Sequence, residues 1–317
     1  MEPRLTVPLR RIAPCSTVQA AWCADSHPPP RNPQRPEVLR RGVRLCCWCA
    51  AQAASVLGGA AAAPASESHS MVKLVSFDVD GTLIHSVGDS ANKVHRQAFK
   101  GAFKQVFDVD TDIDVINHHG CTDPLILLKI LEHHGVAKEE SMPRLGEMQT
   151  SMLQYFETHK DEVADGVAVL PGVKNVLQEL KTRSDVATCL VTGNLEPIGW
   201  GKMEAVGLLD FFSPSPFGGF GSDFCSGNTE ESWRDRAELI RIAATRASHL
   251  LPNPVSERFH IGDTPMDLLA AKEAGAVAIG VTTGTYSRRD LETCGAETVV
   301  LDDLADVSQV LKAMGLE

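Results

Sequence analysis

Short, nearly continuous apolar segments alternate with longer segments of helical periodicity along most of this chain. The short segments are rich in β-branched residues and end at acids or turn-forming residues, so they predict strands at 73–77, 186–191, 258–263, 276–281 and 298–301. Strands without an alternating polar face are typical of a parallel sheet that is covered on both sides. Between two of them, apolar side chains recur at helical spacing: Val173, Val176, Leu177 and Leu180. The predicted fold class is therefore α/β, a doubly wound parallel sheet.

One interval departs from this alternation. Residues 88–164 show only helical patterns, in three apolar stripes: Val94, Ala98, Phe99, Ala102, Phe103 and Val106; Leu125 to Leu131; and Leu145, Met148, Met152, Tyr155 and Phe156. Stripes of this kind favour core packing over cofactor binding. A helical insertion after the first strand predicts a cap domain, with 71–87 and 165–317 as the α/β core and 88–164 as the α-helical cap.

The N-terminal segment has a different composition. Residues 1–70 contain eight Arg, no Lys and four acids, so this segment is basic although the whole chain has a net charge of −11. It is rich in Ala, Arg, Pro and Ser without regular periodicity, which predicts a disordered leader similar to an organelle transit peptide. The alternatives are an over-extended gene model, with Met71 as the natural start, or a disordered functional arm. A genuine leader predicts a chloroplast or mitochondrial location, and otherwise the location is cytoplasmic.

The overall composition excludes some kinds of partner. The acidic net charge of −11 argues against binding to nucleic acid or to an anionic membrane surface. The chain also lacks an uninterrupted apolar run of about 18 residues, which a membrane-spanning helix needs. The pattern carries no indication of oligomeric state.

Polar side chains gather at the ends of three predicted strands. Asp78 and Asp80 follow the first strand, a Thr-Gly-Asn sequence at 192–194 follows the second, and Asp263 with Asp267 follows the third. In open parallel sheets, ligands bind outside the carboxyl ends of the strands. Each group alone is common in turns or helix caps, but carboxylates, a hydroxyl and small residues together predict a site for magnesium and a phosphoryl group.

Three motifs follow these strands in order. They read FDVDGTL at 77–83, LVTGN at 190–194 and IGDTPMD at 261–267. Together they resemble the signature motifs of the haloacid dehalogenase-like (HAD) hydrolase superfamily, on its phosphatase branch. The resemblance covers residues 71–317, and the predicted cap is similar to that of the phosphoglycolate-phosphatase-like members.

The resemblance implies a catalytic role for the residues at the strand ends. Asp78 would be the nucleophile that forms an aspartyl-phosphate, and Asp80 would be the general acid and base. Thr192 would hold the phosphoryl oxygens together with Gly193 and Asn194.

A magnesium ion is also implied by the resemblance, because the substrate phosphate would otherwise face carboxylates. The implied metal ligands are Asp78, Asp80 through its backbone carbonyl, and Asp263, with Asp267 holding the coordination shell. The acid at position 80 favours phosphate esters, since dehalogenases and phosphonoacetaldehyde hydrolases of the superfamily lack an acid there.

A basic residue that neutralises the nucleophile and the phosphoryl group completes the implied set. Arg236 fits the helix that precedes the last motif strand, and Lys202 is the alternative, expected further along its own helix and facing solvent. The segment 222–233 before Arg236 looks like an insertion, and 218–221 is expected to be a loop that enters the Arg236 helix. In the cap, Thr122 and Asp123 are candidates for substrate contact.

The predicted function is that of a magnesium-dependent phosphatase that hydrolyses a small phosphomonoester through an aspartyl-phosphate. The substrate would be a small phosphorylated metabolite, because a cap that closes over a site excludes bulky molecules. One alternative is a phosphomutase of the same superfamily, which delays hydrolysis of the intermediate. Another is a catalytically silent binding protein on the HAD fold, since fold alone does not determine function.

Overall fold

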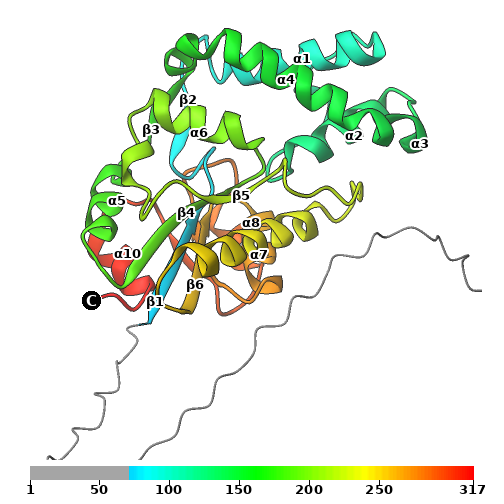
Figure 1. The fold of residues 1–317 in the computed structure, drawn as a ribbon. Helices are drawn as coiled ribbons and strands as arrows, with labels where there is room; N and C mark the ends of the chain where they lie inside the picture. The colour runs from blue at the N-terminus through cyan, green and yellow to red at the C-terminus, as the bar shows by residue number, and fades with distance from the viewer. Residues whose placement is uncertain (1–70) are drawn as a thin grey trace, which may run out of the picture. The chain divides into compact units, whose positions relative to one another are not determined.

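The structure, a computed structural model, describes residues 71–317. Within this range a six-stranded parallel sheet has the order β5-β4-β1-β6-β7-β8 (Figure 1). The strands are β1 (Val72–Phe77), β4 (Val186–Thr192), β5 (Gly218–Phe220), β6 (Val255–Gly262), β7 (Val277–Val281) and β8 (Val299–Leu301). The predicted parallel α/β sheet is confirmed. The predictions made for residues 1–70 lie outside the described residues.

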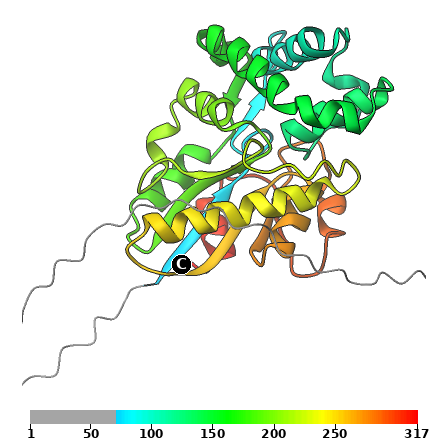
Figure 2. The same cartoon turned by 45° about the vertical axis from the view of Figure 1, so that its right-hand side comes forward.

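Helices cover both faces of this sheet, because alternate residues of β1 point in opposite directions. Val72 and Leu74 belong to the apolar cluster that contains α7, α8 and α9. Val75 and Phe77 belong to the cluster that contains α5, α6 and α10. Helix α7 lies along one face of the sheet in Figure 2. The helices are α5 (Val173–Lys181), α6 (Glu196–Ala205), α7 (Ser232–Leu250), α8 (Pro265–Glu273), α9 (Arg288–Glu292) and α10 (Val307–Ala313).

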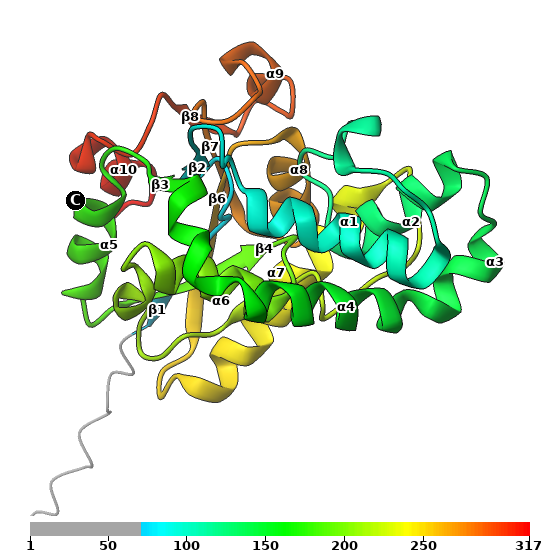
Figure 3. The same ribbon diagram turned by 90° about the horizontal axis from the view of Figure 1, so that it is seen from above.

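The stretch 88–166, between β2 (Ile84–Ser86) and β3 (Val167–Val169) in the chain, consists mostly of helices. These are α1 (Lys93–Phe107), α2 (Asp123–His133), α3 (Lys138–Ser141) and α4 (Leu145–Thr158), with 3-10 turns η1 (Ile113–Val115), η2 (Met142–Arg144) and η3 (Lys160–Gly166). Helices α1 and α4 lie side by side in Figure 3, and their apolar stripes are buried together. We call residues 88–164 the cap, and its status as a separate domain remains a prediction.

Two short strands mark the chain's passage into and out of the cap. Strand β2 (Ile84–Ser86) pairs antiparallel with β3 (Val167–Val169), with Ile84 opposite Val169. The sequence analysis missed both strands, because three residues are too few to show an alternating pattern.

The expectation of a loop at 218–221 was wrong in part, because Gly218–Phe220 forms the edge strand β5 beside β4. A Cβ on Gly218 would lie 2.2 Å from the carbonyl oxygen of Leu190, and one on Gly219 would lie 2.0 Å from that of Leu239. The glycines therefore allow β5 to fit between β4 and α7, but they also remove the apolar side chains that identify a strand. Among the described residues, no helix combines the length and the apolar character needed to cross a bilayer.

Candidate active site

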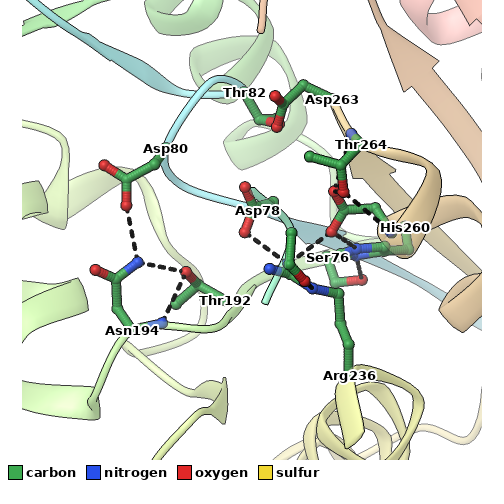
Figure 4. Close-up of polar contacts among 12 residues, drawn as sticks. Ser76, Asp78, Asp80, Thr82, Thr192, Asn194, Arg236, His260, Asp263 and Thr264 are labelled. Carbon is green, nitrogen blue, oxygen red and sulfur yellow. Dashed lines mark hydrogen bonds and ion pairs between the residues drawn. The ribbon is translucent and has the colours of Figure 1, made fainter. Parts of the chain in front are cut away.

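The sheet order brings the predicted motif residues together. Strands β4, β1 and β6 are neighbours and run parallel, so their carboxyl ends meet at one edge of the sheet. Figure 4 shows Asp78 at the centre of this edge, with Thr192 on one side and Asp263 on the other. Sequence positions more than a hundred residues apart therefore form one site.

Asp78 is held by an ion pair with Arg236, which lies in the first turns of α7. Arg236 Nη1 donates to Asp78 Oδ1 at 2.8 Å and to Asp267 Oδ1 at 2.6 Å, and all three residues are buried. Burial raises the pKa of Asp78 to about 6, because desolvation and the charges of Asp267 and Asp80 outweigh the opposing effect of Arg236. The guanidinium thus neutralises only part of the negative charge in the site.

Asp267 has hydrogen-bond donors on both carboxylate oxygens. Oδ1 contacts Arg236 and lies 3.3 Å from His260 Nε2, and Oδ2 accepts from the Thr264 backbone N–H at 3.1 Å and its hydroxyl at 2.6 Å. Burial alone would raise the pKa of Asp267, but Arg236, His260 and Thr264 hold it at about 2. Asp267 is therefore ionised and fully engaged, as expected of a residue that supports the site.

The sequence analysis missed the side chains that support Asp267 from within the sheet. His260 is completely buried in β6, and its Nδ1 lies 3.0 Å from the hydroxyl of Ser76 in β1. Ser76 also donates to the Phe259 carbonyl at 2.9 Å. Their only sequence signal is that polar residues occupy two otherwise apolar strands.

Asp263 differs from Asp267 because it has few partners. In the described range its carboxylate forms no ion pair with a basic side chain, and Thr82 Oγ1 donates to Oδ1 at 3.3 Å. Asp263 is 4% exposed, and its pKa is raised well above the ordinary value by burial and by the charges of Asp78 and Asp267. A buried carboxylate with so few donors has lone pairs left for a cation.

The residues present fit a divalent cation. Asp78, Asp263 and Asp267 each have an oxygen within 4.8 Å of the others. Because the Asp267 oxygens already accept hydrogen bonds, we assign the free coordinating capacity to Asp78 and Asp263. Gly81 and Gly284 leave space here, since a Cβ on either would lie 2.4 Å or 1.7 Å from Asp263 Oδ2. The predicted third ligand, the Asp80 carbonyl, stays a prediction.

Asp80 faces a second basic residue, Lys202, on α6. Lys202 Nζ donates to Asp80 Oδ1 at 2.8 Å and Oδ2 at 2.7 Å, and Asn194 Nδ2 donates to Asp80 Oδ2 at 2.9 Å. Burial raises the pKa of Asp80, but the Lys202 charge and these hydrogen bonds outweigh it and hold the pKa below its usual range. Asn194 Nδ2 also contacts Thr192 Oγ1 at 2.7 Å, which links the second motif to Asp80.

The expectation that Lys202 faces solvent was wrong, because its exposed fraction is 0%. Lys202 shares the buried face of α6 with Ile198 and Gly199, at the spacing of one helical turn. This spacing was the available sequence signal. The two basic candidates are therefore not alternatives in the structure, since Arg236 pairs with Asp78 and Lys202 with Asp80.

The cap contacts the core directly at the second motif. The Asp123 backbone N–H donates to the Gly193 carbonyl at 2.8 Å, and a Cβ on Gly193 would lie 2.5 Å from the Cys121 carbonyl oxygen. Thr122 is completely buried, and Asp123 Oδ2 lies within 3.0 Å of His95 Nε2 and the Leu195 N–H. Contact of either residue with substrate stays a prediction.

A cavity of about 540 Å³ lies between the cap and the strand ends. Its volume is in the range of small-molecule sites, roughly 300–1,000 Å³. The core side contributes every predicted site residue except Asp267, and the cap side contributes several basic or titratable side chains: His95, Arg96, His118 and His119. A parallel α/β sheet with two acids paired to two buried cationic side chains, and a cavity at its strand ends, is the arrangement expected of a hydrolase of phosphate esters.

Comparison with known sequences agrees with this class. The chain belongs to the haloacid dehalogenase-like hydrolase family, whose sequence profile matches residues 72–275. The predicted membership and the predicted class of phosphoric monoester hydrolase are confirmed.

Curated relatives include phosphoglycolate phosphatases of bacteria. The chain is 25% identical over 243 residues to the enzyme from Chromobacterium violaceum, covering 76% of this chain and 97% of the relative. It is 24% identical over 241 residues to the enzyme from Vibrio cholerae, covering 76% and 97%.

Solved structures share the fold. A hydrolase from Pseudomonas syringae aligns with a TM-score of 0.53 at 21% identity, covering 76% of this chain and 98% of that one. A β-phosphoglucomutase from Clostridium difficile aligns with a TM-score of 0.54 at 18% identity, covering 77% and 98%. At these identities the likeness supports the fold alone.

Replacement of Arg236 is expected to destabilise the protein strongly. Arg236→Met would leave Asp78 and Asp267 buried without their shared counter-ion, which typically costs about 3–5 kcal/mol. Denaturant unfolding of the metal-free protein measures the loss. Arg241→Met on the same helix is the matched control, because Arg241 is 38% exposed and pairs with the exposed Glu238 and Glu273, so its loss should stay below about 1 kcal/mol. Equal losses in the two variants would contradict the assigned role of Arg236.

Proposed function

We propose that this protein is a magnesium-dependent phosphatase that hydrolyses a small phosphomonoester through an aspartyl-phosphate on Asp78. The observation that carries the proposal is the separation of two ion pairs at one cavity. Arg236 holds Asp78 with one oxygen available, and Lys202 and Asn194 hold Asp80 beside it. The site therefore contains one acid placed for attack on phosphorus and another placed for proton transfer.

The proposed reaction has two displacements. An oxygen of Asp78 attacks phosphorus and the bond to the ester oxygen breaks. Asp80 must first take up a proton, against the effect of Lys202 on its pKa, and then gives that proton to the departing alcohol. Asp80 then takes a proton from water, which attacks the same phosphorus and releases inorganic phosphate and the Asp78 carboxylate. Thr192 and the backbone N–H groups beside it, at Gly193 and Asn194, would hold the phosphoryl oxygens.

Asp78, Asp263 and the Asp80 carbonyl would hold the magnesium ion. When bound, the ion neutralises the phosphate and the carboxylates around it, which would otherwise repel each other. Asp267 does not need to coordinate it, since its role is to fix Arg236 and the first turn of α8.

The substrate is proposed to be a small phosphorylated metabolite, with phosphoglycolate as the first candidate because the curated relatives carry that name. The cap at 88–164 would act as the domain that closes over it. The cavity also has room for larger phosphomonoesters of the same class.

A panel of phosphate esters that includes phosphoglycolate tests this function. The full-length protein is incubated with each ester, with and without magnesium, and both inorganic phosphate and the remaining ester are measured. Release of phosphate supports a phosphatase. Conversion to an isomeric ester without phosphate release would indicate a phosphomutase, and no conversion of any ester would indicate a silent binding protein.

Removal of magnesium is expected to abolish turnover. EDTA treatment should lower the rate at least about 100-fold, because the substrate phosphate would then face the carboxylates of Asp78 and Asp263 without a cation to neutralise it. Excess magnesium should restore the rate, and calcium, with its looser coordination, should inhibit. Calorimetry of magnesium binding to Asp263→Asn, compared with Asp110→Asn on the cap surface, should show weaker binding only in the first variant. Full activity in EDTA would contradict the metal assignment.

A further inference from the structure

A continuous series of polar side chains runs from Asp80, at the edge of the cavity, through the buried Lys202 and His95 to the buried Asp123 in the cap. Lys202 Nζ contacts Asp80, accepts no hydrogen bond, and lies 2.9 Å from Asn194 Oδ1 and 3.2 Å from His95 Nδ1. An ammonium group has three N–H donors, so these three partners use all of them. His95 comes from α1 and Lys202 from α6, and the link therefore joins cap and core.

The contacts determine the tautomer of His95. Because the ammonium of Lys202 can only donate, His95 Nδ1 is the acceptor. The proton of the neutral ring is then on Nε2, which donates to Asp123 Oδ2 at 3.0 Å. The ring is 7% exposed and lies against Phe99, with 5.0 Å between the ring centroids.

Asp123, the last of these side chains, forms hydrogen bonds with the core loop at 193–195. Its Oδ2 accepts from the Leu195 N–H at 3.0 Å, and its own N–H donates to the Gly193 carbonyl at 2.8 Å. This core loop directly follows Thr192 and contains Asn194. Seating of the cap segment 120–123 and the position of the second motif are therefore linked by the same hydrogen bonds.

We propose that His95 and Asp123 are positioning residues that make the proton-transfer steps depend on the seating of the cap. We call Asp80, Lys202, His95 and Asp123 the cap relay. When the cap segment is seated, His95 Nδ1 is the third acceptor for the Lys202 ammonium, which is then fixed against Asp80. The proposal rests on the phosphatase function proposed above, in which Asp80 is the acid and base.

Lys202 needs such support because its stem is long and flexible. Without His95, one buried N–H of Lys202 has no acceptor, which is unfavourable enough to favour another rotamer. The Asp80 side chain is 38% exposed toward the cavity, so a shifted ammonium would let it turn away from the reacting oxygen. Asp78 is held by Arg236 instead, and Arg236 is fixed by Asp267 as well as by a hydrogen bond from its Nε to the Gly120 carbonyl at 3.3 Å. The attack of Asp78 on phosphorus therefore depends less on the relay than the proton transfers of Asp80 do.

Because Asp78 and Asp80 are held by different basic residues, loss of the relay should slow some reaction steps more than others. With an alkyl phosphate, protonation of the leaving oxygen by Asp80 should slow, and turnover should fall about 100-fold. With p-nitrophenyl phosphate, whose leaving group scarcely needs a proton, the first step should be spared within about threefold. Hydrolysis of the intermediate still requires Asp80, so phosphoenzyme should accumulate on the peptide that contains Asp78.

His95→Phe tests the relay, because it retains a ring against Phe99 and removes both ring nitrogens. His95→Asn is the conservative variant, since its amide can still accept from Lys202 and should restore part of the rate. His159→Phe is the matched control, because His159 also lies in the cap and stacks on Tyr155 with 4.1 Å between centroids, without contact to Lys202. The control should retain the parent rates with both esters.

Hydrogen exchange gives a readout that does not require turnover. The amides of Asp123 and Leu195 should exchange at least about tenfold faster in His95→Phe than in His159→Phe, because seating of the cap segment is weakened. Unchanged exchange of these amides would overturn the relay, whether or not the protein turns over any ester. Absence of turnover with every ester would by itself refute only the proposed phosphatase function. Equal rate losses with both esters and no phosphoenzyme would reduce His95 to a structural role and also overturn the proposal.

Discussion

Asp78→Asn is expected to abolish turnover, because the amide keeps the shape of the side chain but has no anionic oxygen to attack phosphorus. Loss of a catalytic nucleophile typically costs more than about 10⁴-fold, so the rate should fall to background. Phosphate release and mass spectrometry of quenched protein should show neither product nor phosphoenzyme. Asp110→Asn is the matched control, because Asp110 is 74% exposed on the cap surface and pairs only with Lys100 among the described residues. A variant at position 78 as active as the parent would refute the nucleophile assignment.

The same substitution should stabilise the metal-free protein above pH 6. Asp78 has a pKa of about 6 in the folded protein against an ordinary value of 3.8, so the folded state retains a proton that the unfolded chain has released between these values. Stability therefore falls as pH rises from about 4 to 6, by about 3 kcal/mol for a difference of this size. Asp78→Asn should remove that contribution, and unfolding curves at pH 4.5 and pH 7.5 measure it. A parent protein whose metal-free stability rises over this interval, with no change in the variant, would contradict the assignment.

Asp80→Asn is expected to separate the two displacements. The amide keeps the backbone carbonyl and the side-chain shape but can neither protonate the leaving group nor activate water, and each step should slow by about 10²–10⁴-fold. With p-nitrophenyl phosphate the first step should be spared, so phosphoenzyme should accumulate on the peptide that contains Asp78.

Mass spectrometry identifies the modified peptide in that experiment. A phosphoryl group on a histidine or serine would refute the mechanism. Asp80→Asn also removes the charge that faces Lys202, so melting curves must show that the variant is folded before its rates are compared. Asp110→Asn again provides the control.

The cap explains how one cavity could combine catalysis with selection of substrate. Residues 120–123 sit directly on the core loop that follows Thr192, so the position of the cap and the geometry of the second motif are coupled. The cap side of the cavity carries Arg96, His118 and His119, which can meet polar groups of a leaving alcohol. Substrate choice would then depend on cap residues and chemistry on core residues.

Sequence pattern alone predicted every strand of the main sheet except β5, and the residues at the strand ends. Buried parallel strands have nearly continuous apolar segments, and β1, β4, β7, β8 and the buried second half of β6 show them. The motif acids follow these strands directly, so predicting the strands also predicted that Asp78, Thr192 and Asp263 share one edge. The short strands β2, β3 and β5 escaped prediction because three residues, or a glycine pair, carry no periodic signal.

Only the tertiary structure decided which groups act on which. Asp263 and Asp267 are similar by sequence, yet one has few hydrogen-bond donors and the other accepts from Arg236, His260 and Thr264. These differences depend on distances between segments far apart in the chain. Local periodicity in the sequence contains no information about such distances.

Lys202 shows most clearly what the sequence pattern could not predict. Its sequence position indicated a helix, but its burial and its contacts with Asp80 and His95 arise only when folding brings α6, the cap helix α1 and the end of β1 together. The sequence by itself determined the strands, the helices and the acids at the edge of the sheet, because these follow from local hydrophobic patterns and motif order. The tertiary structure decided the pairing of the two bases with the two acids, because a buried charge is stabilised by whichever partners folding places within hydrogen-bond distance.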